Sequence, residues 1–238
     1  VIGYAAMGMM LGLFFTRLSP AVEVPQKPDR PASFPTAKSR FGLHRSRAVV
    51  FKLSMLFSLD AFAGGFVLQS IVAYWFHVRF QVQPALLGGI FFGANILAGL
   101  SALAAAWVAS RIGLIKTMVF THIPSNLLLI SVPLMPNLTL AITVLLLRFS
   151  ISQMDVPTRQ SYTMALVDPD ERSAAAGITG IARTAGASLS PVLTGPLLAH
   201  AALLSVPFFL SGGLKILYDL LLYRSFRALR PPEEKASA

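Results

Sequence analysis

The chain of 238 residues has no cysteine and few acidic side chains. The absence of cysteine excludes disulfide bonds and thiolate metal sites, and the four histidines show no spacing typical of metal ligands. We therefore predict neither a metal nor a cofactor. Only 13% of the residues are charged, 55% are hydrophobic and the mean hydropathy is +0.66. That composition excludes an ordinary soluble globular domain.

Apolar segments long enough to cross a bilayer recur along the chain, which predicts an all-α membrane protein in contact with lipid. The formal net charge is +10, but most basic residues lie between the apolar segments. That placement is typical of membrane orientation, so we expect no nucleic-acid partner. We predict a six-helix transmembrane bundle preceded by one partial helix. The predicted spans are 49–78, 84–109, 117–134, 138–165 with an interruption near Pro157, 173–200 and 203–226.

The polar segments divide the chain into four predicted parts. Residues 1–15 are too short to span a bilayer and are interpreted as the end of the last transmembrane helix of a missing upstream part. Residues 16–48 are rich in proline and basic side chains and predict a cytosolic linker. Residues 49–228 form the predicted bundle, and residues 229–238 a cytosolic tail.

Several polar side chains share one face of the predicted helix 138–165. They are Arg148, Ser152, Asp155, Arg159 and Tyr162. Charges at membrane depth are unfavourable unless they face a protein interior or a wet cavity. We therefore predict that this face lines a cavity that receives substrate. The alternative is a buried ion-pair network that only holds helices together.

Three charged residues on three different predicted spans lie near mid-membrane depth. At 1.5 Å per residue, Asp60, Arg148 and Arg183 are each about 15 Å into their helices. Burial penalises an ionised carboxylate, so an unpartnered Asp60 could carry a coupling proton. Paired to Arg148 or Arg183, Asp60 would instead be structural. Lys215 and Asp219 are four residues apart, and we predict that they form a structural ion pair.

The turn that follows span 84–109 resembles a loop motif of the major facilitator superfamily. The segment AWVASRIGLIK, residues 106–116, is similar to the pattern G-x-L-a-D-R-x-G-R-[RK]. Arg111 and Gly113 match, and Lys116 supplies a closing cation one place late. Ala106 stands at the glycine and Ser110 at the aspartate.

Two further stretches carry the same resemblance. Gly186, Pro191 and Gly195 resemble the glycine–proline helix of antiporter-type members, with altered spacing. The stretch DVPTRQSYTMALVDPDERSAAAG, residues 155–177, is similar to bacterial efflux-type members. With one partial span, a basic linker, six spans and a basic tail, the chain resembles the C-terminal half of such a transporter.

The resemblance implies a secondary active transporter that moves small molecules by alternating access, as proton- or ion-coupled efflux. Proton- or ion-coupled uptake of a sugar or organic anion is the alternative, and a non-transporting membrane scaffold or receptor a third reading. We expect no enzyme, because GASL at 186–189 lacks the second glycine of a serine-protease turn. The implied partners are a substrate, a coupling ion expected to be a proton, and a missing N-terminal six-helix half. The implied location is the cell inner membrane.

Overall fold

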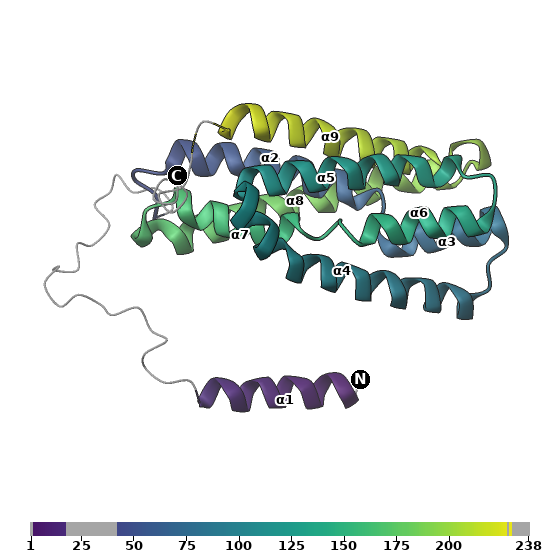
Figure 1. Cartoon of the computed structure of the whole chain (residues 1–238), viewed down its shortest axis with the longest axis horizontal. Helices are drawn as coiled ribbons and strands as arrows, with labels where there is room; N and C mark the ends of the chain where they lie inside the picture. The colour runs from purple at the N-terminus through teal and green to yellow at the C-terminus, as the bar shows by residue number, and fades with distance from the viewer. Residues whose placement is uncertain (1, 18–41, 228, 230–238) are drawn as a thin grey trace, which may run out of the picture. The chain divides into compact units, whose positions relative to one another are not determined.

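The computed structural model describes residues 2–17, 42–227 and 229 (Figure 1). The chain separates into two units, Val1–Ser39 and Arg40–Ala238. In the first unit, α1 (Ile2–Thr16) is a helix, as predicted for residues 1–15. Residues 18–41 of the predicted linker lie outside the described residues, and so does the predicted tail apart from residue 229.

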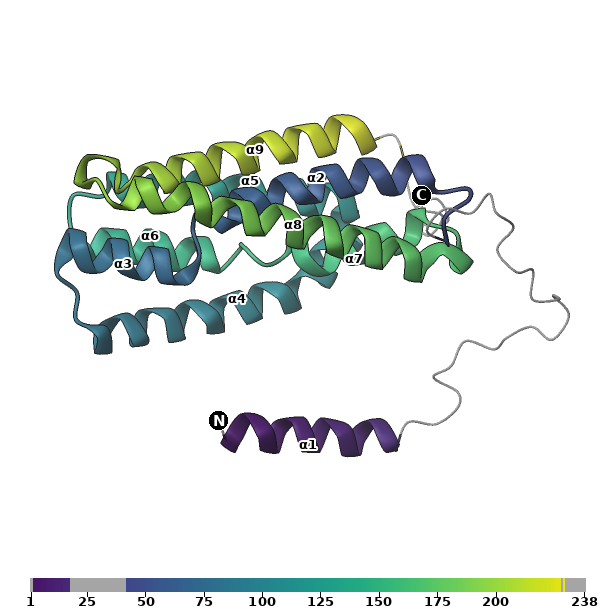
Figure 2. The same cartoon turned by 180° about the vertical axis from the view of Figure 1, so that it is seen from behind.

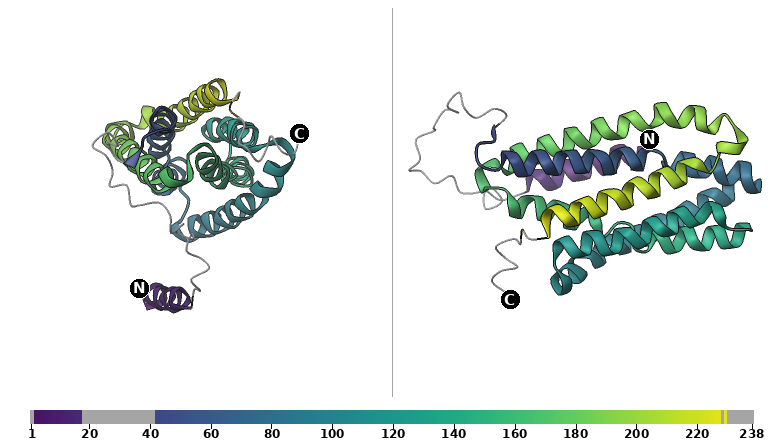
Figure 3. Two further views of the ribbon diagram at one scale, coloured as in Figure 1. Left: turned by 90° about the vertical axis from the view of Figure 1, so that its left-hand side faces the viewer. Right: turned by 90° about the horizontal axis from the view of Figure 1, so that it is seen from above.

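The second unit is built from helices alone among the residues described, with no strand (Figures 1 and 2). The α-helices are α2 (Arg47–Gly65), α3 (Gln69–Phe80), α4 (Pro84–Ile112), α5 (Leu114–Ser131), α6 (Leu138–Phe149), α7 (Asp155–Leu166), α8 (Arg172–Leu198) and α9 (Val206–Phe226). Short 3-10 helices are η3 (Val132–Leu134), η4 (Pro169–Glu171) and η5 (Ala201–Leu203). Within this unit the helices run side by side, and α2 packs against α8 and α9 (Figure 3).

Four helical segments of the described chain are long and apolar enough to cross a membrane. They are Arg47–Phe80, Pro84–Ile112, Leu114–Leu134 and Ala201–Phe226. Leu138–Phe149 is apolar but shorter, and Arg172–Leu198 is diluted by glycine, serine and threonine. The structure is therefore that of a helical membrane protein, and the count of six spans stays a prediction.

Two predicted helices are interrupted. Span 49–78 is not continuous, because α2 ends at Gly65 and α3 begins only at Gln69. The consecutive glycines at 64 and 65 have low helix propensity, and the turn closes when the Val67 amide donates to the Gly64 carbonyl.

The second interruption lies in span 138–165, earlier than the position predicted near Pro157. The chain leaves the helix at Ser150–Met154, and Pro157 is the third residue of α7. A proline is tolerated there, because amides in the first turn of a helix have no intrahelical partner.

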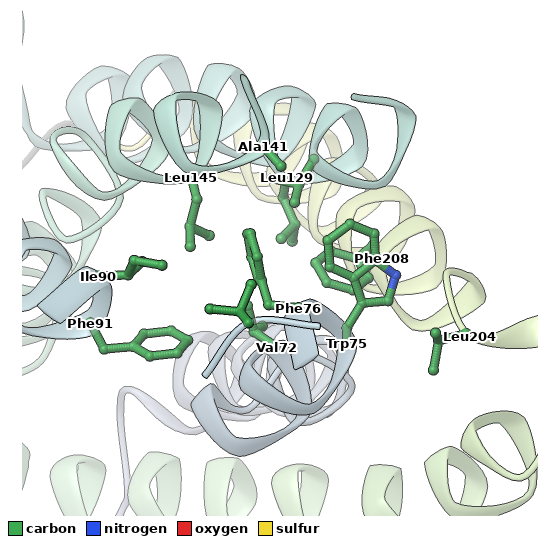
Figure 4. Packing of buried hydrophobic residues seen from close by; sticks show 12 residues of the cluster. Val72, Trp75, Phe76, Ile90, Phe91, Leu129, Ala141, Leu145, Leu204 and Phe208 are labelled. Atoms are coloured by element: carbon green, nitrogen blue, oxygen red, sulfur yellow. The ribbon is translucent and has the colours of Figure 1, made fainter. Parts of the chain in front are cut away.

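A polar layer separates two hydrophobic clusters of the bundle. One cluster includes Trp75, Phe76 and Phe208, with Phe76 at its centre (Figure 4). The other includes Phe57 and Tyr218. Along α2, α5, α9 and the α6–α7 pair, polar residues lie in sequence between the two clusters. They are Asp60, His122, Ser125, Asn126, Arg148, Ser152, Asp155, Arg159, Ser211 and Lys215. We call them the polar layer.

The last residues of the predicted linker belong to the bundle. Leu43 is buried in a small cluster with Val50, Val167 and Ala175, and α2 already begins at Arg47. The boundary predicted at residue 48 is therefore wrong by about six residues, because an isolated leucine among basic residues gave no signal of burial.

Helices α2 and α8 pack closely at glycine residues. A Cβ added at Gly186 would overlap the Ser58 carbonyl oxygen, and one added at Gly65 would overlap the Ser190 hydroxyl. Pro191 lies inside α8 and leaves the Ala187 carbonyl without a helical donor. The Ser190 hydroxyl donates to that carbonyl at 3.0 Å. Gly195, by contrast, faces open space.

This contact predicts that Gly186→Ala destabilises the protein. The added methyl group must push α8 away from the α2 backbone, and overpacking of this kind costs about 1–3 kcal/mol. Thermal unfolding in detergent measures the loss as a lower Tm. Gly180→Ala is the matched control, because it lies on the same helix with no atom within 4 Å and should be neutral or stabilising. Equal Tm values for the two variants would contradict the close packing.

Candidate functional site

A buried carboxylate on α2 is bound by cations from three other helices. Asp60 Oδ2 accepts hydrogen bonds from Arg159 Nη1 of α7 at 3.0 Å and from Arg183 Nη1 of α8 at 3.1 Å. Asp60 Oδ1 accepts one from Lys215 Nζ of α9 at 2.7 Å. Only 4% of the Asp60 side chain is exposed, so these bonds replace the solvation that water would provide.

A second carboxylate joins the site through a shared arginine. Arg159 Nη1 also donates to Asp155 Oδ2 at 3.0 Å, and its guanidinium lies 5.5 Å from the centre of the Phe57 ring. We call Asp60, Asp155, Arg159, Arg183 and Lys215 the Asp60 cluster. Exposure divides its cations, since the Arg183 side chain is 35% exposed, Lys215 11% and Arg159 8%.

Of the two alternatives for Asp60, the unpartnered acid is not what the structure contains. The partners of Asp60 are Arg159, Arg183 and Lys215, so the pairing alternative is the one that the structure contains, with Arg183 rather than Arg148. Three donors on three helices converge on one carboxylate. A single sequence could place these residues at similar depth but not on facing helices.

The predicted pair of Lys215 with Asp219 is wrong. Lys215 binds Asp60, whereas Asp219 accepts from His122 Nδ1 at 2.9 Å and from Asn126 Nδ2 at 3.4 Å. The reason is that α9 packs against both α2 and α5, so the two side chains find partners on different helices. The sequence signal for this second site was the pair His122 and Asn126, four residues apart within an apolar helix.

The residues predicted to line one face of a helix do not form one face, because the helix breaks among them. Arg148 belongs to α6, its Nε is buried without a hydrogen-bond partner in the described part of the chain, and its guanidinium lies over the Phe149 ring. Ser152 lies in the turn and is buried. Tyr162 packs in a hydrophobic cluster, and its hydroxyl donates to the carbonyls of Phe226 and Leu229.

The loop-motif residues lie at the junction of α4 and α5. Gly113 has φ +89°, a conformation that only glycine adopts without strain, and it separates the two helices. Arg111 is exposed and its guanidinium lies 5.4 Å from the Trp107 ring centre. Lys116 is exposed as well.

Glu171 is a buried acidic residue whose role sequence reasoning missed. Its carboxylate accepts the backbone amides of His44, of Arg45 at 2.8 Å and of Ser46 at 2.9 Å, just before α2 begins. Burial alone would raise the pKa of the Glu171 carboxyl, but these hydrogen bonds lower that pKa to about 2. The partners are more than 120 residues apart in the chain, so no local pattern announced them.

Histidine, aspartate and glutamate side chains are the possible metal ligands in the part of the chain that the structure describes. No group of three or more histidine, aspartate or glutamate side chains is arranged there to hold a metal ion. The site is a set of ion pairs and hydrogen bonds between packed helices of the bundle.

Comparison with known proteins agrees with this architecture. Residues 1–191 match the family model of the Major Facilitator Superfamily, so the chain belongs to that family of membrane transporters. The chain is also 28% identical over 194 residues to the "Uncharacterized membrane protein YJR124C" of Saccharomyces cerevisiae. That alignment covers 81% of this chain and 43% of the yeast protein, so the chain spans less than half the length of that relative.

The ion pairs predict that Asp60→Asn is strongly destabilising. The substitution leaves Arg159, Lys215 and the partly exposed Arg183 with only Asp155 to balance them, and breaking a buried pair in this way costs about 3–5 kcal/mol. Adding Lys215→Met should recover much of the loss, because it restores the original charge excess. Tm measurements on single and double variants test this. Equal Tm values for the single and double variants would show that the pairs do not determine stability.

The hydrogen bonds of Glu171 predict that the thermal stability of the protein depends on pH. The folded-state pKa of about 2 lies below the ordinary 4.5, so the stabilisation is present above pH 4.5 and is lost as pH falls towards 2. Glu171→Gln should therefore lower Tm at neutral pH by several degrees and flatten its fall below pH 4.5. Asp170→Asn, a change at the exposed neighbour, is the control. A variant curve parallel to wild type across the acid range would contradict this assignment.

Proposed function

We propose that the protein is a secondary active transporter that moves a small molecule across the membrane by alternating access, driven by a proton or ion gradient. The observation that carries the proposal is the Asp60 cluster, which joins α2, α7, α8 and α9 inside a membrane-embedded bundle. Buried charges on separate transmembrane helices typically mark substrate and ion pathways. Membership of the family supports the same conclusion.

The interrupted helices support the proposal independently. The α2–α3 and α6–α7 interruptions fall near Asp60 and Asp155, respectively. Non-helical backbone at membrane depth is tolerated where protein or a wet cavity satisfies it, and discontinuous helices form the binding sites of many transporters. The Gln153 amide, for example, donates to the Ser101 hydroxyl of α4 at 3.3 Å.

The positions of the cations give a physical route to coupling. Arg159, Arg183 and Lys215 belong to different helices, so a rigid-body movement of one helix changes the set of cations at Asp60. A buried carboxylate that keeps its cations stays ionised, whereas one that loses them favours protonation. Asp60 is thus our coupling candidate through exchange of its partners, and not as an isolated acid.

The finer features of the proposal rest on the resemblance of the sequence to efflux-type members. We propose export as the direction, with uptake of a sugar or organic anion as the alternative. We further propose that the bundle is the second half of a twelve-helix transporter, with the linker and C-terminus cytosolic and the cell inner membrane as its location.

Proton flux in proteoliposomes tests the proposed function. An internal pH-sensitive dye should report proton movement when sugars, organic anions or amines are added one at a time to the reconstituted protein. The Asp60→Asn/Lys215→Met variant should lose this flux while keeping much of its Tm. Arg224→Gln, at an exposed residue in the last turn of α9, nine positions beyond Lys215, should keep it. Undiminished flux in the double variant would end the role of Asp60 in coupling.

A further inference from the structure

The Asp60 cluster contains more positive than negative charge. The carboxylates of Asp60 and Asp155 face the cations Arg159, Arg183 and Lys215, a formal excess of one positive charge. The charges nearby do not remove this excess. Arg148, within electrostatic range of Asp155, adds a positive charge, and Asp219, within range of Asp60 and Lys215, adds a negative one.

The titratable group that faces Asp219 does not lower this count. With His122 neutral the excess stays at one positive charge, and with His122 protonated it rises by one. A buried cation without a counter-charge is unfavourable in a membrane-embedded protein. The Asp60 cluster, with its charged neighbours, is therefore electrostatically complementary to an anion.

Arg183 is the cation of the cluster whose remaining hydrogen-bond donors are accessible. Arg159 bridges two carboxylates, whereas Arg183 donates one hydrogen bond to Asp60 from Nη1 and keeps 35% of its side chain exposed. A guanidinium has five N–H donors in a planar fork, which suits the paired oxygens of a carboxylate or phosphate group. The close contact of Gly186 with Ser58, one turn along α8, holds Arg183 against α2.

We propose that the Asp60 cluster is the binding site for a small organic anion, whose carboxylate or phosphate group binds the free edge of Arg183. The proposal rests on the proposed transport function and names its substrate class. The bound anion neutralises the positive charge excess of the cluster. Arg148, whose buried Nε has no hydrogen-bond partner among the described residues, is a further donor of the same layer.

The first test needs no ligand. Removing Arg183 leaves two carboxylates facing two cations, so Arg183→Gln should keep or raise the Tm of the purified full-length protein. Arg159→Gln is the matched comparison on the same carboxylate. It deprives both Asp60 and Asp155 of a partner and should lower Tm markedly. A fall in Tm for Arg183→Gln as large as that for Arg159→Gln would overturn the proposal, because Arg183 would then be a structural residue.

The second test measures anion binding directly. Potassium succinate, citrate and phosphate should each be compared with potassium chloride at equal ionic strength, and with glucose as a neutral solute. At least one oxyanion should raise the Tm of the wild type by several degrees above the chloride value, and Arg183→Gln should abolish that rise. The exposed Arg111→Gln should retain it. Response to succinate and citrate alone identifies a carboxylate site, and response to phosphate alone a phosphate site.

The remaining outcomes separate this proposal from the proposed function. A wild type that responds to the oxyanions no more than to chloride, or an Arg183→Gln variant that keeps the response, overturns the anion site. Proton flux that responds to sugars or amines but to none of the organic anions would also overturn the anion site, and it would leave the transport function intact. Oxyanion stabilisation that depends on Arg183, in a protein without any solute-dependent flux, supports the site and contradicts the transport function.

Discussion

The architecture of the bundle depends on one buried carboxylate and its three cations. Asp60 lies on α2, and its partners on α7, α8 and α9 hold four helices at one depth. A carboxylate or an arginine alone would be strongly unfavourable there, and the pairing offsets that desolvation only when the geometry is good. Each helix therefore has a preferred rotation and depth relative to α2, since an arrangement that breaks these pairs without replacing them strands a charge in an apolar interior.

Two hydrophobic clusters flank the polar layer along the helices. One cluster contains Trp75, Phe76 and Phe208, and the other contains Phe57 and Tyr218. Apolar packing is non-directional and tolerates small shifts, whereas the ion pairs of the layer are directional. Movement that loosens one cluster while the other stays packed would change the partners of Asp60 without unfolding the bundle. The interruptions at 66–68 and 150–154 divide two of the helices near this layer.

The sequence predicted the helices well and their partners poorly, for a physical reason. Apolar runs located α4, α5 and α9 but not the breaks inside spans 49–78 and 138–165, and the helix rise placed Asp60, Arg148 and Arg183 near mid-depth. Spacing of four residues suggested Lys215 with Asp219, but only inter-helix packing decides that one faces α2 and the other α5. Likewise, no local pattern could join Glu171 to the amides before α2.

The cations of the Asp60 cluster differ in what they contribute. Arg159 is 8% exposed, bridges Asp60 and Asp155 from Nη1 and lies over the Phe57 ring, so it is enclosed by the protein. Arg183 makes one of its hydrogen bonds to the same carboxylate and leaves an edge accessible. A cluster built only for stability would have balanced its charges, since an uncompensated cation opposes burial. The excess positive charge therefore lies on Arg183, whose accessible edge can bind an anionic ligand.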